Sequence, residues 1–132
     1  MMEEYIMDHQ ILKESIVNAE NNSDFDLILS LDKKREVIDD MINFTSKKDQ
    51  NNDRGHKNLI IAMEELSELT KEISKSLRDE HDRLGLMEEI VDVEHVILTL
   101  CNVFNISDDE LNKIRYVKTK RIIDRVNSEE FH

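Results

Sequence analysis

Proline is absent from the 132 residues of this chain, and glycine occurs only twice. Both residue types interrupt regular helices, whereas the helix-favouring residues Glu, Lys, Leu and Ile are plentiful here. Apolar residues recur at intervals of three and four, and no segment has the convincing period-two alternation of a strand. The sequence therefore predicts an all-α protein, and its length favours one domain with a moderate core.

Polar stretches separate the segments that have helical periodicity. Ser107 and Glu110 have the spacing of a capping box, which predicts the start of the last helix. A run of Asn, Asp and Gly between residues 45 and 57 predicts a loop. Helices are thus expected at about residues 3–19, 24–44, 57–77, 86–104 and 107–126. We divide the chain into an N-terminal helical extension (1–56), a second helical region (57–127) and a frayed tail (128–132).

The formal net charge is −12, because 30 acidic residues outnumber 18 basic ones. An acidic protein gains no general free energy from counterion release when it binds a polyanion. A nucleic acid polymer is therefore not expected as the main partner. No stretch approaches the roughly 20 apolar residues that span a bilayer, and the acidic start lacks the basic region of a signal peptide. The single cysteine, Cys101, cannot form an internal disulfide. We therefore expect a cytoplasmic protein with no membrane partner.

Two neighbouring helical segments each carry acids three residues apart, Glu65 with Glu68 and Glu89 with Asp92. Each of these acids, like Glu72, comes one residue before a member of an apolar stripe. One residue corresponds to about 100° of helix rotation, which puts the acids at the edge of the buried face. Because the loop between the segments is short, we expect an antiparallel hairpin whose acidic edges face each other. The expected stripes are Ala62, Leu66, Leu69, Ile73 and Leu77, followed by Leu86, Ile90, Val93, Ile97 and Leu100.

Acids gathered between two packed helices need their negative charge compensated. Two carboxylates about 4 Å apart repel by roughly 4 kcal/mol at an effective dielectric near 20. Four of them, half removed from water, require protons or a divalent cation. Ligand sets made only of oxygen suit Mg²⁺ or Mn²⁺, and Mg²⁺ completes its shell with water and substrate phosphates. The pattern indicates phosphate-ester or anhydride chemistry, and ordinary surface acids are the alternative in a chain this acidic.

The last predicted helix carries a line of cations. Leu111 and Ile114 lie on one of its faces, and the same face continues as Lys118, Arg121 and Arg125. Cations that extend an apolar stripe are expected to point inward, where they would offset the negative charge of phosphates. The alternative is that these cations have no ligand, since cations near a helix C-terminus are favoured by the helix macrodipole alone.

Taken together, these residues resemble the MazG-like all-α nucleoside triphosphate pyrophosphohydrolases. The signature of that family is E-x-x-E, a gap of one to two dozen residues, and E-x-x-D. It matches Glu65 to Glu68 and Glu89 to Asp92, and Glu64 doubles the first acid as family members often do. Glu88 does the same in the second motif, and the resemblance covers residues 58–126, about half of the chain. It implies that Glu65, Glu68, Glu89 and Asp92 hold Mg²⁺ and that Lys118 and Arg121 contact phosphates.

The resemblance also implies an activity and an assembly. A nucleoside triphosphate would be hydrolysed by water attacking the α-phosphorus, which releases a nucleoside monophosphate and pyrophosphate. Pairing of two hairpins in a homodimer, or in a dimer of dimers, would complete a four-helix core. Two departures matter: Asn58 stands where many members have Gln, and residues 1–56 match nothing in the family. Capping of the bundle, completion of a nucleotide pocket and assembly all stay open as roles for this extension.

Two other functions compete with this hypothesis. Asp92 and His95 have the spacing of one metal-ligand pair, but a di-metal redox bundle needs a second such pair. A non-catalytic helical interaction module is disfavoured because all four acids and both expected cations are present. His95 is interpreted as a surface or partly buried residue, and Cys101 as a small core residue. The pattern indicates neither the base nor the sugar of the nucleotide.

Overall fold

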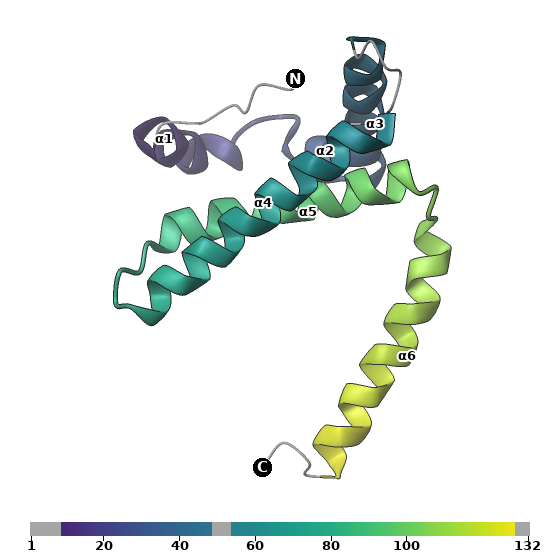
Figure 1. Ribbon diagram of the computed structural model, residues 1–132. Helices are drawn as coiled ribbons and strands as arrows, with labels where there is room; N and C mark the ends of the chain where they lie inside the picture. Colours follow the sequence, from purple (N-terminus) through teal and green to yellow (C-terminus); the bar gives the residue numbers. More distant parts are fainter. Residues whose placement is uncertain (1–8, 49–53, 129–132) are drawn as a thin grey trace.

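The computed structural model describes residues 9–48 and 54–128, with side chains described for all of them except 45–48 and 54. This part of the chain consists of helices joined by short turns and contains no strand, so the all-α prediction is confirmed (Figure 1). Its helices are α1 (His9–Ala19), α2 (Phe25–Leu29), α3 (Leu31–Lys48), α4 (Arg54–Leu77), α5 (Arg83–Val103) and α6 (Asp108–Asn127).

The centre of the fold is the antiparallel hairpin of α4 and α5, which are 24 and 21 residues long. Asp79 lies in the left-handed region at φ 60°, and the Glu80 amide donates to the Lys75 carbonyl at 2.9 Å, which ends α4 in a Schellman motif. Asp82 then caps α5, because its side chain accepts a hydrogen bond from the Gly85 amide at 3.1 Å. This cap starts α5 three residues before the predicted boundary at Leu86.

Helix α3 packs on both arms of the hairpin and completes a small core (Figure 1). Ile42 is fully buried and Ile38 is 8% exposed, and they share the core with Ala62 and Val96. A hydrogen bond from the Asn102 amide to the Asp39 carboxylate also joins α3 to α5. The segment that precedes residue 57 thus forms part of the core.

Several predicted boundaries need correction. The helix expected over residues 24–44 is broken at Ser30, whose extended backbone separates α2 from α3. The Ser30 hydroxyl accepts a hydrogen bond from the Lys33 amide at 3.2 Å and so caps α3. Helix α3 also runs to Lys48 and α4 begins at Arg54, which shortens the loop predicted for residues 45–57. The expected start of the first helix at residue 3 and most of the tail at 128–132 lie outside the described residues.

Helix α6 leaves the end of α5 and extends away from the hairpin (Figure 1). Its start matches the prediction, because the Ser107 side chain accepts a hydrogen bond from the Glu110 amide at 3.1 Å. Asn105 turns the chain at φ 54°, and an ion pair of 3.4 Å between Arg35 and Asp108 holds the first turn against α3. No residue of α6 is buried.

The apolar stripes of the hairpin are only partly covered. Ala62 is 4% exposed as expected, whereas Ile73 is 51% exposed and Ile97 is 47% exposed. The prediction of two buried stripes is therefore wrong for the single chain, because α3 covers only one end of the hairpin. The accessible surface is 10569 Å², whereas a compact monomer of 15.6 kDa exposes about 7,200 Å².

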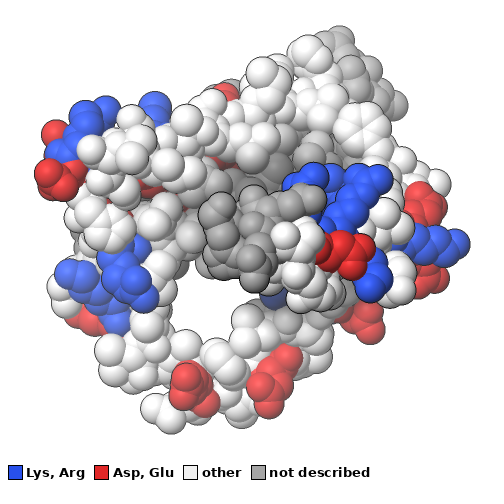
Figure 2. Space-filling view, turned by 90° about the horizontal axis from the view of Figure 1, so that it is seen from below, with Lys and Arg blue, Asp and Glu red and all other residues white. Residues whose placement is uncertain are grey.

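In Figure 2, uncharged side chains form wide areas between separate groups of charged ones. Within residues 9–48 and 54–128, no helix combines the length and the apolar character needed to cross a membrane.

Candidate metal centre

Three carboxylates meet where α4 and α5 pack together. Glu65 of α4 and Glu89 and Asp92 of α5 each offer one oxygen, and these oxygens all lie within 4.8 Å of one another. The antiparallel hairpin brings them together, because Glu89 and Asp92 lie one turn apart on α5 opposite Glu65. All three are half-buried. The predicted convergence of the acidic edges therefore holds for three of the four expected ligands.

Glu89 has one oxygen that is removed from solvent. Its Oε2 atom is buried and has no hydrogen-bond partner within the described part of the chain. Burial raises the pKa of Glu89 from 4.5 to about 7, and the charges of Asp92 and Glu68 add to the shift. Near neutral pH this site therefore holds either a proton or a compensating cation.

Glu68, the fourth expected ligand, lies beside the group but not in it. Its Oε1 atom accepts a hydrogen bond from Lys71 Nζ at 3.2 Å, so part of its charge is already compensated. Its charge still contributes to the raised pKa of Glu89. In this structure Glu68 acts on the triad of Glu65, Glu89 and Asp92 through electrostatics.

Glu72 is a half-buried acid that the predicted ligand set did not include. Its side chain is 14% exposed, and its Oε2 atom has no hydrogen-bond partner within the described residues. The other oxygen accepts a hydrogen bond from Lys75 Nζ at 3.0 Å, and this bond raises the pKa of Lys75. A Cβ at Gly85 would lie 3.2 Å from Glu72 Oε2 and 2.7 Å from Asp82 Oδ2, so a larger residue there would require the Asp82 side chain to shift. The signal for Glu72 was present in the sequence, since it occupies the same helix edge as Glu65 and Glu68.

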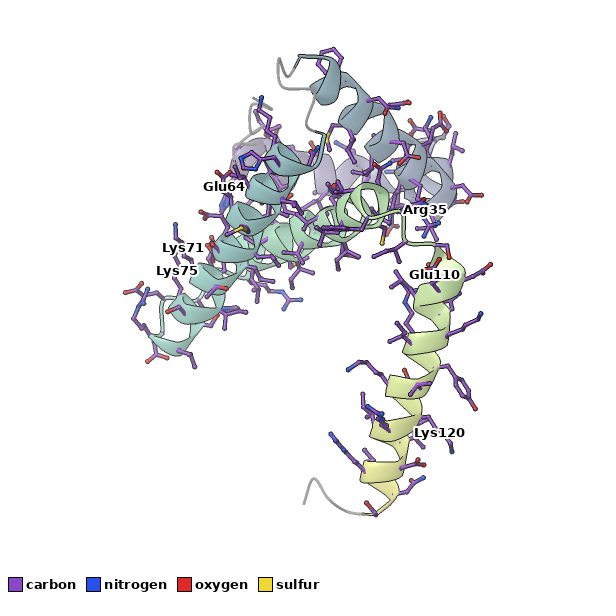
Figure 3. All side chains as sticks on the ribbon, turned by 45° about the vertical axis from the view of Figure 1, so that its right-hand side comes forward. Arg35, Glu64, Lys71, Lys75, Glu110 and Lys120 are labelled. Carbon is purple, nitrogen blue, oxygen red and sulfur yellow. The ribbon has the colours of Figure 1, made fainter. Side chains whose placement is uncertain are left out.

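The expected phosphate-binding cations lie elsewhere in the single chain. Lys118, Arg121 and Arg125 are all exposed on α6, which extends away from the hairpin. Figure 3 shows this separation through Lys120 on α6 and Lys71 and Lys75 on α4. The structure therefore does not bring the three cations to the acids of the same chain.

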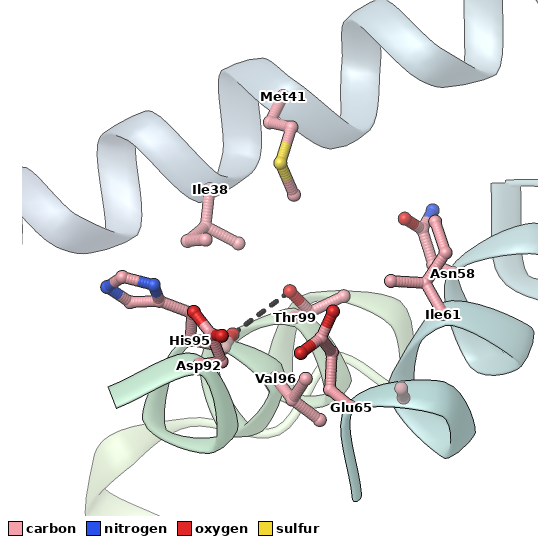
Figure 4. Close-up of a pocket in the computed structure, with 10 residues that line it drawn as sticks. Ile38, Met41, Asn58, Ile61, Glu65, Asp92, His95, Val96 and Thr99 are labelled. Carbon is pink, nitrogen blue, oxygen red and sulfur yellow. Dashed lines mark hydrogen bonds between the residues drawn. The ribbon is translucent and has the colours of Figure 1, made fainter. Parts of the chain in front are cut away.

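A pocket of about 170 Å³ opens between α3, α4 and α5, directly beside the triad (Figure 4). Glu65 and Asp92 both line it, and most of its remaining wall is apolar. The Thr99 hydroxyl, also in the wall, donates a hydrogen bond to the His95 carbonyl at 3.0 Å. His95 lines the pocket but does not belong to the triad. Cys101 is half-buried and does not line the pocket.

The donor set fits a hard divalent cation. All three groups are carboxylates, and oxygen-only ligands favour Mg²⁺ or Mn²⁺ over metals that prefer nitrogen or sulfur. A divalent cation would also compensate the Glu89 oxygen, which has no hydrogen-bond partner among the residues that the structure describes. Chemically, the arrangement can hold one cation at the mouth of an apolar pocket.

Comparison of the chain with protein-family models, with curated proteins and with solved structures finds no match.

Proposed function

We propose that the protein is a Mg²⁺-dependent nucleoside triphosphate pyrophosphohydrolase of the MazG-like type. The observation that carries this proposal is the convergence of Glu65, Glu89 and Asp92, from two helices, beside a pocket that Glu65 and Asp92 also line. The motifs E-x-x-E and E-x-x-D supply these same residues, so sequence pattern and geometry agree at three positions. Mn²⁺ is the expected substitute for Mg²⁺.

In the proposed site, Glu65, Glu89 and Asp92 hold the cation. When bound, Mg²⁺ supplies charge neutralisation for the triphosphate and favours ionisation of water. The oxygen of water forms a bond to the α-phosphorus, the bond from that phosphorus to the α–β bridging oxygen breaks, and pyrophosphate leaves. Glu68 and Glu72 flank the triad on α4, and one of them accepts the proton of the attacking water.

The proposal assigns the phosphate contacts to Lys118, Arg121 and Arg125 of a second copy of the chain. Because α6 extends away from its own hairpin, these cations would reach the triad of a partner more readily than their own. The large exposed surface and the open apolar stripes of α4 and α5 support this assembly. A homodimer, or a dimer of dimers, would complete a four-helix core from two hairpins.

We also propose a cytoplasmic location and a role in control of the nucleotide pool. A reducing compartment suits a chain whose single cysteine, Cys101, carries no disulfide. Nucleoside triphosphates are the substrates in that setting. The strong negative charge argues against nucleic acid polymers as partners.

The test is hydrolysis of a panel of canonical and modified NTPs and dNTPs with Mg²⁺, with monophosphate and pyrophosphate both measured. Asp92→Asn is expected to lower turnover by at least about a hundredfold, because a displaced metal ligand removes charge stabilisation in the transition state. Glu94→Gln, which changes an exposed acid on the same helix, serves as the matched control and should leave turnover unchanged. Absence of turnover with every nucleotide, or equal turnover in Asp92→Asn, would overturn the proposal.

A further inference from the structure

We infer that the pocket beneath α3 holds the heterocyclic base of the nucleotide, and that Met41 and Ile38 of α3 determine which base is accepted. This inference rests on the proposed function and adds to it a specificity site. It also gives a role to part of the N-terminal extension, which the MazG-like motifs do not cover. Helix α3 becomes one wall of the site.

The position of the pocket fits this role. Glu65 and Asp92 both line the cavity, so a nucleotide whose phosphates are near these acids has its base within reach of the pocket. Ile38 and Met41 extend from α3 toward the cavity on one side, and Val96 of α5 faces them from the other (Figure 4). Two of the three triad acids, Glu65 and Asp92, border the same opening.

The pocket is large enough for only one part of a nucleotide. A whole drug-sized ligand needs a pocket of about 300–1,000 Å³, whereas this cavity measures about 170 Å³. It therefore suits a single flat ring system and excludes a complete nucleotide. Phosphates are also excluded from its interior, because the nearest charged groups, Glu65 and Asp92, are negative.

The chemistry of the wall suits a base. Ile38, Ala62 and Val96 provide apolar surface that can pack on the faces of a ring. Asn58 is 3% exposed and lines the same cavity, so its amide adds a polar group to the largely apolar wall. Apolar walls with a few polar groups are typical of small-molecule sites.

The wall formed by α3 is held in place at several points. Ile42 is fully buried beneath it, Asp39 accepts a hydrogen bond from Asn102 of α5, and Arg35 pairs with Asp108 at 3.4 Å. Met41, by contrast, is half-buried and has a flexible thioether side chain. Met41 is therefore the side chain that adapts to the bound ring, on a helix that stays fixed.

Binding can be tested without catalysis by nuclear magnetic resonance of ¹³C-labelled methionine methyl groups in the full chain. Uridine, cytidine, adenosine and guanosine are titrated separately, and the Met41 signal is assigned from its loss in Met41→Leu. At least one nucleoside is expected to shift the Met41 signal while the signal of Met63, which is 68% exposed, stays in place. No shift of the Met41 signal with any of the four would overturn the inference.

Specificity is tested by comparing Met41→Ala with the matched control Met63→Ala. Met41→Ala is expected to change the ratio of kcat/KM between two bases by about tenfold, as removal of methylene contacts typically does. Hydrolysis of ribose 5-triphosphate, which has no base, should be equal in Met41→Ala and the parent. Equal effects of Met41→Ala on all nucleotides and on ribose 5-triphosphate would contradict a base pocket.

The two proposals fail in different ways. A Met41 shift with nucleosides, in a protein that hydrolyses no triphosphate, would support the base pocket and overturn the proposed reaction. Mg²⁺-dependent hydrolysis with no Met41 shift would overturn the base pocket and leave the proposed reaction in place.

Discussion

Glu65 of α4 and Asp92 of α5 face each other across the hairpin, with one carboxylate oxygen of each within 4.8 Å of the other. Glu89 lies within the same distance of both, and all three acids are half-buried. Like charges this close are favourable only when a proton or a cation compensates them. This relationship makes cation binding the first property to measure.

We predict that the protein binds Mg²⁺ and that the triad carries most of the affinity. Asp92→Asn should weaken binding at least about a hundredfold, because it removes the charge of a direct ligand. Glu68→Gln should weaken it only about tenfold, because Glu68 lies beside the group and is paired with Lys71. Isothermal titration calorimetry measures both effects, with Glu94→Gln as the control. Equal losses for Glu68→Gln and Asp92→Asn would mean that Glu68 is a direct ligand.

Without a divalent cation, the free energy of unfolding should fall as pH rises. Glu89 has a pKa of about 7 in the folded protein and an ordinary value of 4.5 in the unfolded chain. Between these values the folded state keeps a proton that the unfolded state has lost, so stability decreases with pH across this window. The loss should reach about 2 kcal/mol, since one pKa unit corresponds to about 1.4 kcal/mol and Glu89 keeps some contact with solvent.

Urea unfolding in the presence of a chelator, at pH values from 5 to 8, measures this dependence. Glu89→Gln cannot ionise and should reduce the slope, whereas Glu94→Gln should leave it in place. Added Mg²⁺ should stabilise the protein more at pH 8 than at pH 5, because protons compete with the cation at low pH. A slope that Glu89→Gln leaves unchanged would assign the pH dependence to other acids.

Removing the cap of α5 should destabilise the hairpin. The Asp82 carboxylate accepts a hydrogen bond from the Gly85 amide, and this bond holds the pKa of Asp82 below its usual value. Asp82→Ala should lower the free energy of unfolding by about 1 kcal/mol, as loss of an N-cap usually does. Glu80→Ala, an exposed change in the same loop, should cost less, because its partner Arg78 is exposed too. Chemical denaturation compares the two variants, and equal losses would argue against a specific role of the cap.

The open apolar stripes predict self-association. Ile97 is 47% exposed on α5, and a charge there should weaken pairing of two hairpins through the cost of burying it. Sedimentation equilibrium should give the parent protein at least twice the mass of one chain and Ile97→Asp a lower mass. Val17→Asp, on α1, changes an even more exposed apolar residue and should keep the parent mass. A parent protein that stays at 15.6 kDa would contradict the proposed assembly.

The sequence predicts the helical hairpin well because its signals are local. Helical periodicity and a short polar loop depend on residues that are close in sequence, and so does the helix cap at Ser107. The structure contains the helices, the loop and the cap that these signals predict. Ser30 shows where such reasoning fails. Its hydroxyl can end one helix and start the next, but the apolar period continues across it and predicts a single helix.

Other differences come from contacts between distant segments. Periodicity identifies the face of Ile73 and Ile97 as apolar, but it does not indicate whether the covering surface belongs to the same chain. It also assigns Lys118 and Arg121 to one face of α6, yet the direction of α6 depends on the turn at Asn105. The convergence of Glu65 with Asp92 was predictable because the short loop fixes the register of the hairpin. Periodicity likewise does not indicate that Glu72 Oε2 lies near Gly85 of α5, where an added Cβ would be 3.2 Å away from it.

The most direct test of the central claim follows oxygen through the reaction. The protein is incubated with Mg²⁺ and a nucleoside triphosphate in ¹⁸O-labelled water, and the products are analysed by mass spectrometry, with Asp92→Asn in parallel. Attack at the α-phosphorus predicts one labelled oxygen in the monophosphate, none in the pyrophosphate, and little product with Asp92→Asn. Label in pyrophosphate or inorganic phosphate, or equal product from Asp92→Asn, would contradict a pyrophosphohydrolase centred on Glu65, Glu89 and Asp92.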